Sequence, residues 1–266
     1  MGFIMKVTDH NYNGAIPYLQ QGIESGVPGT IDGRFFLHLG DALYRVGRHE
    51  DAQKVYDLGY KKNVFLSPWQ RSLHNVDRLK AQPWWTERDT EVEDKLRMLA
   101  ENWKVIRDEG LAQLNDVTGA FELESEDLSH TGEWRQFTLY RQGHKVHGNC
   151  RKTPKTCELL DQFPEATMCK RGQIKYSVMH PGIHVWPHCG PTNCRIRAHL
   201  GLVVPPGLKI RVVNETRTWT EGKFIVFDDS FDHEVWHEGK SLRLVLIVDI
   251  WHPELSTRER ATLPAI

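Results

Sequence analysis

The chain has 266 residues, with 34 basic against 35 acidic side chains and a formal net charge of −1. This balance argues against binding to a phosphate backbone, so we expect no nucleic-acid partner. A content of 39% hydrophobic and 26% charged residues is typical of an ordered globular protein. Because no apolar run approaches the roughly 18–20 residues of a bilayer span, we expect no membrane span in this chain.

The first part of the chain predicts helices. From residue 11 to about residue 59 apolar residues recur at helical spacing, with glycine-containing turns between them. An aromatic residue, a Leu-Gly pair and small residues fit the tetratricopeptide template at Phe36, Leu39, Gly40, Leu43, Ala52, Tyr56 and Gly59. A stable array needs about three repeats, so a generic helical hairpin stays open as the alternative. We assign residues 1–85 to this tetratricopeptide-like region and its aromatic connector.

Residues 86–266 predict a second domain that is rich in strands. Thr90 followed by Glu93 indicates a capping box that opens a helix continuing past Ile106. The predicted strands cover residues 136–141, 174–179, 195–204, 209–213, 224–228 and 243–251. Because most of these strands follow one another without helices, they predict an antiparallel sandwich or barrel, and a jelly roll fits their number. The fold class is therefore α+β.

The five cysteines form neither a dense disulfide framework nor a paired CxxC zinc site. Cys150 and Cys157 flank a short polar stretch, and this spacing fits a disulfide in an oxidising compartment, with two free thiols as the alternative. The triplet that begins at Asn214 is an N-glycosylation sequon, so Asn214 is a candidate acceptor.

Histidines gather in the strand-rich part, where seven of the fourteen lie between residues 180 and 252. The segment 180–188 contains Pro and Gly, which predicts a rigid turn-bearing segment rather than a helix. His188 and His233 each lie at an expected strand end, and Arg243 opens an apolar strand. A guanidinium that points inward there requires an anion. Two imidazoles and such an arginine suit non-haem Fe(II) with a dicarboxylate co-substrate, although ordinary surface or core roles stay open for each histidine.

Several long runs carry a resemblance to a known family. They are HVWPHCGPTNCRIRAHLGL (184–202), NETRTW (214–219), FDDSFDHEVW (227–236) and VDIWHPEL (248–255), with shorter runs at 33–36, 69–73, 79–85, 106–111 and 263–266. These runs closely resemble the aspartyl/asparaginyl β-hydroxylases. The likeness covers nearly the whole chain, including the tetratricopeptide-like helices.

The resemblance implies a double-stranded β-helix oxygenase that uses Fe(II), O₂ and 2-oxoglutarate. Its expected activity is hydroxylation of the β-carbon of Asp or Asn in epidermal-growth-factor-like domains, which would be its partners. By the same resemblance, His188 and His233 would be the iron ligands. Arg243 and Ser177 would hold the distal carboxylate of 2-oxoglutarate.

Three residues of one predicted strand form a polar row. Arg195, Arg197 and His199 alternate on one face, which fits an inward polar face, with a solvated strand face as the alternative. The resemblance implies that Arg197 and His199 bind near the metal-chelating end of 2-oxoglutarate. We expect Lys175, Arg195 and Asp229 to contact the substrate.

One position departs from the usual two-histidine, one-carboxylate pattern. Two residues after His188 the chain has Gly190, as the family does, so we expect only two protein ligands for the iron. Asp228 and Asp229 precede His233 closely, and a carboxylate ligand from there stays open, as does a turn-capping role. The family's substrate-facing loop is poorly matched at residues 125–130, which leaves the choice of substrate open.

Location follows from the resemblance alone. Members of the family lie in the endoplasmic reticulum lumen behind an N-terminal membrane anchor, so we expect a lumenal site and a longer, anchored full-length form.

Two rival functions remain. An inactive oxygenase-fold module would bind epidermal-growth-factor-like domains without catalysis, and a zinc hydrolase would use the same histidines, although a third protein ligand for zinc is not evident from the sequence.

Overall fold

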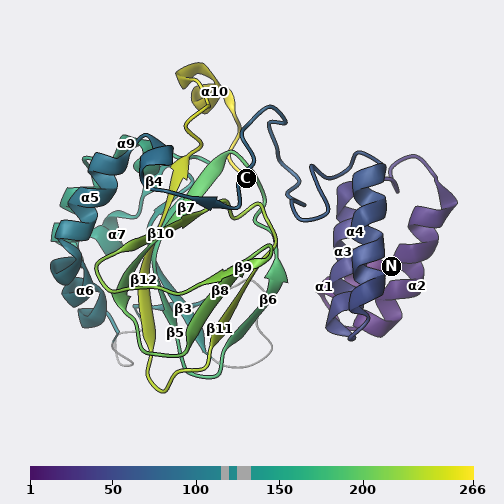
Figure 1. The fold of residues 1–266 in the computed structure, drawn as a ribbon, viewed down its shortest axis with the longest axis horizontal. Helices are drawn as coiled ribbons and strands as arrows, with labels where there is room; N and C mark the ends of the chain where they lie inside the picture. Colours follow the sequence, from purple (N-terminus) through teal and green to yellow (C-terminus); the bar gives the residue numbers. More distant parts are fainter. Residues whose placement is uncertain (115–119, 125–132) are drawn as a thin grey trace. The chain divides into compact units, whose positions relative to one another are not determined.

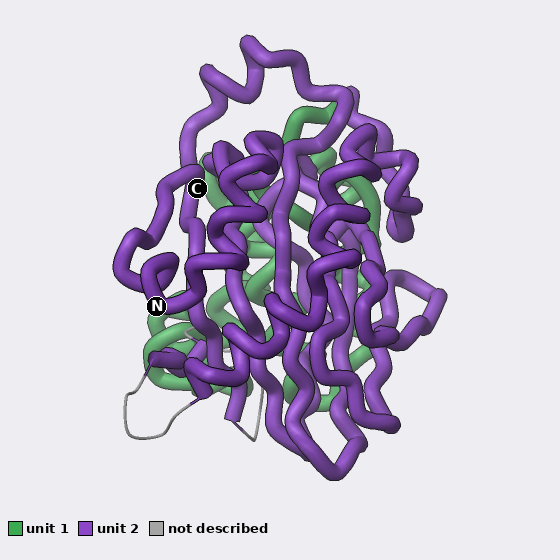
Figure 2. The backbone as a smooth tube through the Cα atoms, turned by 90° about the vertical axis from the view of Figure 1, so that its left-hand side faces the viewer, with its two compact units in different colours: residues 1–77 green, residues 78–266 purple. Residues whose placement is uncertain are grey.

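The computed structural model describes residues 1–114, 120–124 and 133–266. It divides into two compact units, Met1–Asp77 and Arg78–Ile266 (Figures 1 and 2). The first unit is helical, and the second combines helices with two β-sheets. The units divide at Asp77 rather than at residue 85, because Trp84 and Trp85 form a strand of the second unit. Within the described ranges, no helix is long and apolar enough to cross a bilayer.

The first unit contains the helices α1 (Gly2–Val7), α2 (Tyr12–Ser25), α3 (Gly33–Arg45) and α4 (His49–Lys61). The side chains of Asn11 and Asp32 cap α2 and α3, because each accepts a hydrogen bond from a backbone N–H of the first turn. A side chain at Gly40 would overlap the ring of Tyr56, so this glycine lets α3 and α4 approach closely. The helical prediction is confirmed, while the tetratricopeptide assignment stays a prediction.

Two antiparallel sheets form the second unit. The larger has the order β1-β10-β7-β12-β5-β3-β2, with β4 beside β3, and the smaller has the order β6-β11-β8-β9. The strands are β1 (Trp84–Trp85), β2 (Glu122–Leu123), β3 (Trp134–Arg141), β4 (His144–Lys145), β5 (Gln173–Met179), β6 (His184–His188), β7 (Arg195–Val203), β8 (Leu208–Val212), β9 (Glu215–Arg217), β10 (Phe224–Phe227), β11 (His233–His237) and β12 (Arg243–Trp251). The two sheets face each other as a double-stranded β-helix (Figure 1).

Most predicted strands are confirmed. The ends of β5, β7, β8, β10 and β12 lie within one residue of their predicted positions. The strands β6 and β11 were not predicted, because β6 contains Pro187 and the pattern of both is short and mixed. Their pairing carries a register shift between His233 and Val235, which accommodates the proline-containing strand.

Helices η1 (Arg88–Thr90), α5 (Glu93–Glu101), α6 (Trp103–Ala112), α7 (His147–Cys150), α8 (Pro154–Leu160), α9 (Pro164–Thr167) and α10 (Thr257–Thr262) complete the second unit. The predicted capping box is wrong. The hydroxyl of Thr90 donates to the carbonyl of Glu87, which ends η1, and α5 starts separately at Glu93. The single predicted helix is also interrupted at Asn102, whose side-chain amide donates to the carbonyl of Met98.

Strands β5, β7 and β12 are buried on both faces, and their side chains alternate between two environments. Even-numbered residues, such as Tyr176, Leu200 and Leu246, belong to an apolar cluster with residues of α5, α6, α8 and α9. Odd-numbered residues face the space between the sheets, where Val245 packs with Val185 and other side chains of the smaller sheet. Polar side chains at other odd-numbered positions of the same three strands also point into this interior.

Candidate functional site

The polar residues of the larger sheet line one interior. Each occupies an odd-numbered position on β5, β7 or β12: Lys175, Ser177, Arg195, Arg197, His199, Arg243 and Asp249. Six of them are buried, and Arg197 is nearly so, with a side chain that is 13% exposed. The row on β7 is therefore an enclosed polar face and not a solvated one.

His188 and His233 end β6 and begin β11, and the two residues are directly paired in the sheet. Their ring centroids lie 4.1 Å apart. Nδ1 of His188 lies 2.7 Å from the carbonyl oxygen of Trp186, and Nδ1 of His233 lies 2.9 Å from that of Phe231. Because a carbonyl only accepts hydrogen bonds, each Nδ1 carries a proton, and in the neutral form of each ring Nε2 is then the nitrogen with the lone pair.

The histidine pair fits a divalent metal. Burial and the neighbouring His188 lower the pKa of His233 to about 3, so its imidazole is neutral at physiological pH. A neutral imidazole whose Nδ1–H is held by a carbonyl is the usual form of a metal ligand. No group of three or more His, Cys, Asp or Glu side chains suited to a metal occurs among the described residues, so the candidate donors here are the two histidines alone.

Gly190 and Asp229 explain the missing carboxylate ligand. A Cβ atom on Gly190 would lie 2.6 Å from Cγ of Asp229, so a carboxylate-bearing side chain does not fit two residues after His188. The backbone N–H of Gly190 donates to the carbonyl oxygen of Asp229 at 2.6 Å, which fixes the two segments together. The space that an acidic ligand would need is filled by another acid.

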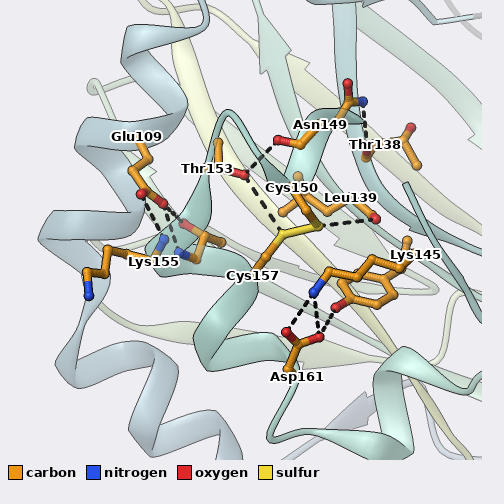
Figure 3. Close-up of a disulfide and its surroundings, with 12 residues drawn as sticks. Glu109, Thr138, Leu139, Lys145, Asn149, Cys150, Thr153, Lys155, Cys157 and Asp161 are labelled. Atoms are coloured by element: carbon orange, nitrogen blue, oxygen red, sulfur yellow. Dashed lines mark hydrogen bonds and ion pairs between the residues drawn. A yellow bond between two sulfur atoms is a disulfide. The ribbon is translucent and has the colours of Figure 1, made fainter. Parts of the chain in front are cut away.

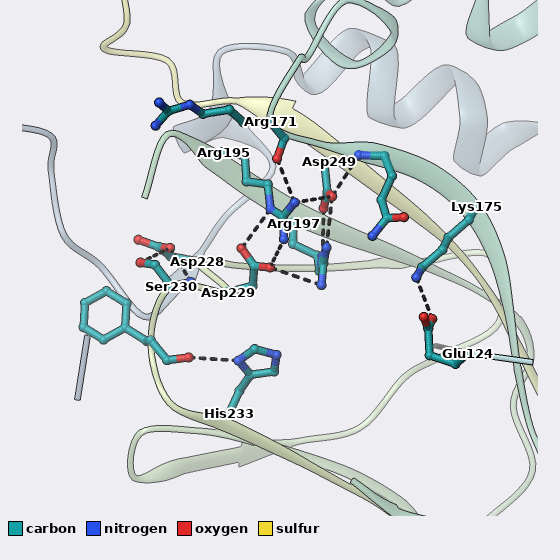
Figure 4. A network of polar contacts seen from close by, with 12 residues as sticks. Glu124, Arg171, Lys175, Arg195, Arg197, Asp228, Asp229, Ser230, His233 and Asp249 are labelled. Carbon is teal, nitrogen blue, oxygen red and sulfur yellow. Dashed lines mark hydrogen bonds and ion pairs between the residues drawn. The ribbon is translucent and has the colours of Figure 1, made fainter. Parts of the chain in front are cut away.

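Asp229 holds two arginines of β7 (Figure 4). Its carboxylate accepts hydrogen bonds from Arg195 at 2.6 and 3.2 Å and lies 3.1 Å from Nη1 of Arg197. These two guanidinium groups hold the pKa of Asp229 well below its usual range, although its burial opposes the shift. Asp249 of β12 binds both arginines from the other side. Asp229 was expected to contact substrate; its carboxylate binds the two arginines, and the substrate contact stays a prediction.

Arg243 differs from Arg195 and Arg197, because no carboxylate among the described residues balances its positive charge. Its Nη2 donates to the hydroxyl of Ser177 at 2.9 Å, and this hydroxyl also accepts a hydrogen bond from the indole of Trp134 at 3.0 Å. Nε of Arg243 is buried without a partner, and no carboxylate among the described residues pairs with the guanidinium. Burial lowers the pKa of Arg243 to about 9, so it remains charged at neutral pH. A buried, uncompensated cation beside a hydroxyl fits the carboxylate of a small organic acid.

His199 lies on β7, close enough to the charges of Arg197 and Arg243 to be affected by both. Its Nδ1 accepts a hydrogen bond from Trp219 at 3.3 Å, and its Nε2 is buried without a partner. Burial, with the nearby charges of Arg197 and Arg243, lowers the pKa of His199 well below its usual value. The ring is therefore a neutral group with one unused nitrogen, suited to a polar ligand that the chain itself does not provide.

A polar cavity of about 230 Å³ adjoins this interior through Arg195. Its walls include Glu124, Gln136, Arg171, Lys175 and Arg195. Lys175 and Arg195, both expected to contact substrate, thus line one cavity. Glu124, Gln136 and Asp249 were missed by sequence reasoning. Asp249 left a signal, because an acid inside the apolar run of β12 requires a buried cation.

Three further predicted residues lie away from this interior. Cys150 and Cys157 form a disulfide that joins α7 to α8, and Thr153 lies between them in contact with Cys157 (Figure 3). Asn214 is exposed in the turn between β8 and β9. The segment 125–130, where the likeness to the family is poor, lies outside the described residues.

The fold and the site define a jelly-roll protein with a pair of adjacent histidines, His188 partly and His233 fully buried, and a buried arginine without a carboxylate partner among the described residues. Residues 100–253 match the family model described as aspartyl/asparaginyl beta-hydroxylase, and the chain belongs to this family. Over all 266 residues it is 58% identical to the human aspartyl/asparaginyl beta-hydroxylase and 59% identical to that of the mouse. It spans about a third of the length of these curated relatives, 35% and 36% respectively.

More distant similarities cover parts of the chain. The human aspartate beta-hydroxylase domain-containing protein 2 is 43% identical over 140 residues, which are 51% of this chain and 38% of that protein. Among solved structures, a cupin-like protein from Thermotoga maritima has a TM-score of 0.33 and 11% identity, covering 56% of this chain and 98% of the other.

Proposed function

We propose that this protein is an Fe(II)- and 2-oxoglutarate-dependent dioxygenase that hydroxylates the β-carbon of Asp and Asn residues in epidermal-growth-factor-like domains. The observation that carries the proposal is the pairing of His188 with His233 in the same interior as the uncompensated Arg243. The human and mouse relatives are named as aspartyl/asparaginyl beta-hydroxylases, which supports a hydroxylase activity on aspartyl and asparaginyl residues.

The chain offers a place for each reactant. His188 and His233 would hold Fe(II) through Nε2, while Arg243 and Ser177 would bind the distal carboxylate of 2-oxoglutarate. His199, with its unused Nε2, would donate to or accept from the same co-substrate near Arg197. When bound, the pair of cofactors would supply the oxidising chemistry, in which O₂ and 2-oxoglutarate become CO₂, succinate and the oxygen atom of the new hydroxyl group.

The remaining residues orient the substrate and exclude water. The apolar cluster between the sheets, which includes Trp219 and Phe227, would keep bulk water from the histidine pair. The cavity lined by Lys175 and Arg195 would receive the Asp or Asn side chain and bring its β-carbon toward the metal. Arg195 is suited to this role because Asp229 and Asp249 hold its guanidinium rigidly.

An anaerobic titration tests the cofactor assignment. Fe(II) and 2-oxoglutarate added together should produce a visible charge-transfer band that neither produces alone. Absence of the band would favour an inactive binding module, whereas hydrolysis with zinc and without 2-oxoglutarate would favour the hydrolase. Mass spectrometry of a panel of epidermal-growth-factor-like peptides should then detect a gain of one oxygen atom on Asp or Asn.

We extend the proposal to location. The disulfide between Cys150 and Cys157 and the exposed Asn214 of the sequon support folding in the endoplasmic reticulum lumen, with a membrane-anchored full-length form as in the family. In secreting cells, endoglycosidase treatment should lower the apparent mass of the protein, and Asn214→Gln should abolish this shift. A wild-type protein without a glycan would contradict this part of the proposal.

A further inference from the structure

The segment 263–266, which follows α10, lies against the cavity that we assign to the substrate. Its last residue, Ile266, lines this cavity together with Arg171, Lys175 and Arg195. Ile266 is half-buried, and it has the one apolar side chain among the described residues that line the cavity. A polar cavity with one apolar contact suits an Asp or Asn side chain, in which a single CH₂ group carries a polar end.

Two side chains of the cavity wall hold the segment 263–266 by hydrogen bonds to its main chain. Nε of Arg171 donates to the carbonyl oxygen of Pro264 at 3.1 Å. Nε2 of Gln142 donates to a main-chain oxygen of Ile266 at 2.6 Å. A hydrogen bond from a charged donor such as a guanidinium is stronger than one between neutral groups. These bonds therefore fix the position of the segment, and with it that of the Ile266 side chain.

Arg171 also joins this segment to Arg195, which we expect to contact the substrate (Figure 4). The carbonyl oxygen of Arg171 accepts a hydrogen bond from Nη1 of Arg195 at 2.7 Å. Nη1 of Arg171 donates to the hydroxyl of Thr192 at 3.2 Å, in the connection between β6 and β7. Because Arg171 is only 6% exposed, little water competes for these bonds. One buried arginine therefore connects the segment 263–266 with a guanidinium of the cavity.

We propose that the segment 263–266 forms one wall of the substrate cavity, with Ile266 in contact with the substrate and Arg171 linking the segment to Arg195. The inference rests on the proposed function and concerns the same cavity. None of the residues that we assign to Fe(II) or to 2-oxoglutarate is among the described residues that line this cavity. The segment therefore acts on the peptide substrate and leaves the binding of the metal and of 2-oxoglutarate unchanged.

Ile266→Ala is the direct test, because it removes most of the side chain and keeps the main-chain oxygen that Gln142 binds. For an epidermal-growth-factor-like peptide, kcat/KM should fall about tenfold, a size expected when an apolar contact is lost from a substrate pocket. The KM for 2-oxoglutarate should stay within about twofold of wild type. Met168→Ala is the matched control, since it removes an apolar side chain that lines a different cavity beside Ala261. Both values should stay within about twofold of wild type in this control.

Deletion of residues 264–266 tests the segment as a whole. It removes both Ile266 and the carbonyl that Arg171 binds, so kcat/KM for the peptide should fall further than in Ile266→Ala. The band that Fe(II) forms with 2-oxoglutarate should remain in both variants, which shows that the cofactor site is intact.

Two results would overturn the inference. One is a kcat/KM for the peptide within about twofold of wild type in both variants. The other is a KM for 2-oxoglutarate that rises as much as kcat/KM for the peptide falls, because the segment would then support the whole site rather than the substrate cavity. If the wild-type protein hydroxylates no such peptide, the proposed function itself fails, and this inference fails with it.

Discussion

The carboxylate of Asp229 occupies the space that a side chain at Gly190 would need. The Cβ of such a side chain would lie 2.6 Å from Cγ of Asp229, which Arg195 and Arg197 hold in place. Because both partners of this contact are buried, neither has room to move aside. Packing around this glycine therefore leaves no room for an acidic side chain two residues after His188, which is consistent with the proposed two-histidine donor set.

Substitution of this glycine should disrupt the fold locally. We expect Gly190→Ala to lower the free energy of unfolding by about 1–3 kcal/mol, as overpacking of a buried site does. Gly190→Asp should be worse and should not improve Fe(II) affinity, since its carboxylate would meet that of Asp229. Chemical denaturation and anaerobic Fe(II) titration measure the two effects. Tighter Fe(II) binding by the Asp variant would contradict this account.

Removal of either histidine should abolish activity. His188→Ala and His233→Ala each delete one of the two proposed iron ligands, so succinate formation and Fe(II) binding should both be lost. His184→Ala is a matched control, because His184 lies on the same strand and its ring pairs with Glu234. The control should keep both properties, and turnover in either ligand variant at the wild-type rate would refute the assignment.

We expect Arg243 to bind 2-oxoglutarate and, as a buried cation without a carboxylate partner among the described residues, to lower the free energy of unfolding. Replacing it with Met removes a buried cation that has no carboxylate partner, so the free energy of unfolding should stay the same or rise by about 1 kcal/mol. The KM for 2-oxoglutarate should rise tenfold or more, since a charged hydrogen-bonded pair is lost. A loss of stability above about 2 kcal/mol would instead indicate a structural role for Arg243.

Asp228 should make stability depend on pH. Burial raises its pKa from 3.8 to about 8, so between these values the folded state keeps a proton that the unfolded state releases. The contribution of Asp228 to stability is therefore lost as the pH rises through this range. Asp228→Asn should be more stable than wild type by about 1–3 kcal/mol at pH 8, and the difference should vanish near pH 4. Urea denaturation of both proteins at pH 8 and pH 4 measures this difference in stability. A difference of equal size at the two pH values would show that the titration of Asp228 is not its cause.

The disulfide should contribute to the stability of the second unit. Replacing Cys150 and Cys157 with Ser opens a short loop, so we expect a loss of about 2 kcal/mol in the free energy of unfolding. Reduction of the wild-type protein should give a similar loss, while the same reductant should leave the double variant unchanged. Thermal melting with and without reductant compares them, and equal stability of all forms would contradict the expectation.

The sequence predicted the strands of the larger sheet that bear the polar site residues more accurately than it predicted strand β6 of the smaller sheet. The ends of β5, β7 and β12 were predicted because β-branched runs with polar residues at every second position are a local signal. The strand β6 and the break in the helix at Asn102 were missed. In both places a long-range contact or a side-chain hydrogen bond outweighs the local pattern.

The amino-acid sequence by itself determined the element order, the alternation that places Arg195, Arg197 and His199 on one face, and membership of a known family. Only the tertiary structure decided which charges are compensated. Asp249 and Asp229 neutralise the arginines of β7, Glu124 neutralises Lys175, and Arg243 has no such partner. Alternation depends on neighbouring residues along one strand, whereas the pairing of charges depends on which strands the register brings together.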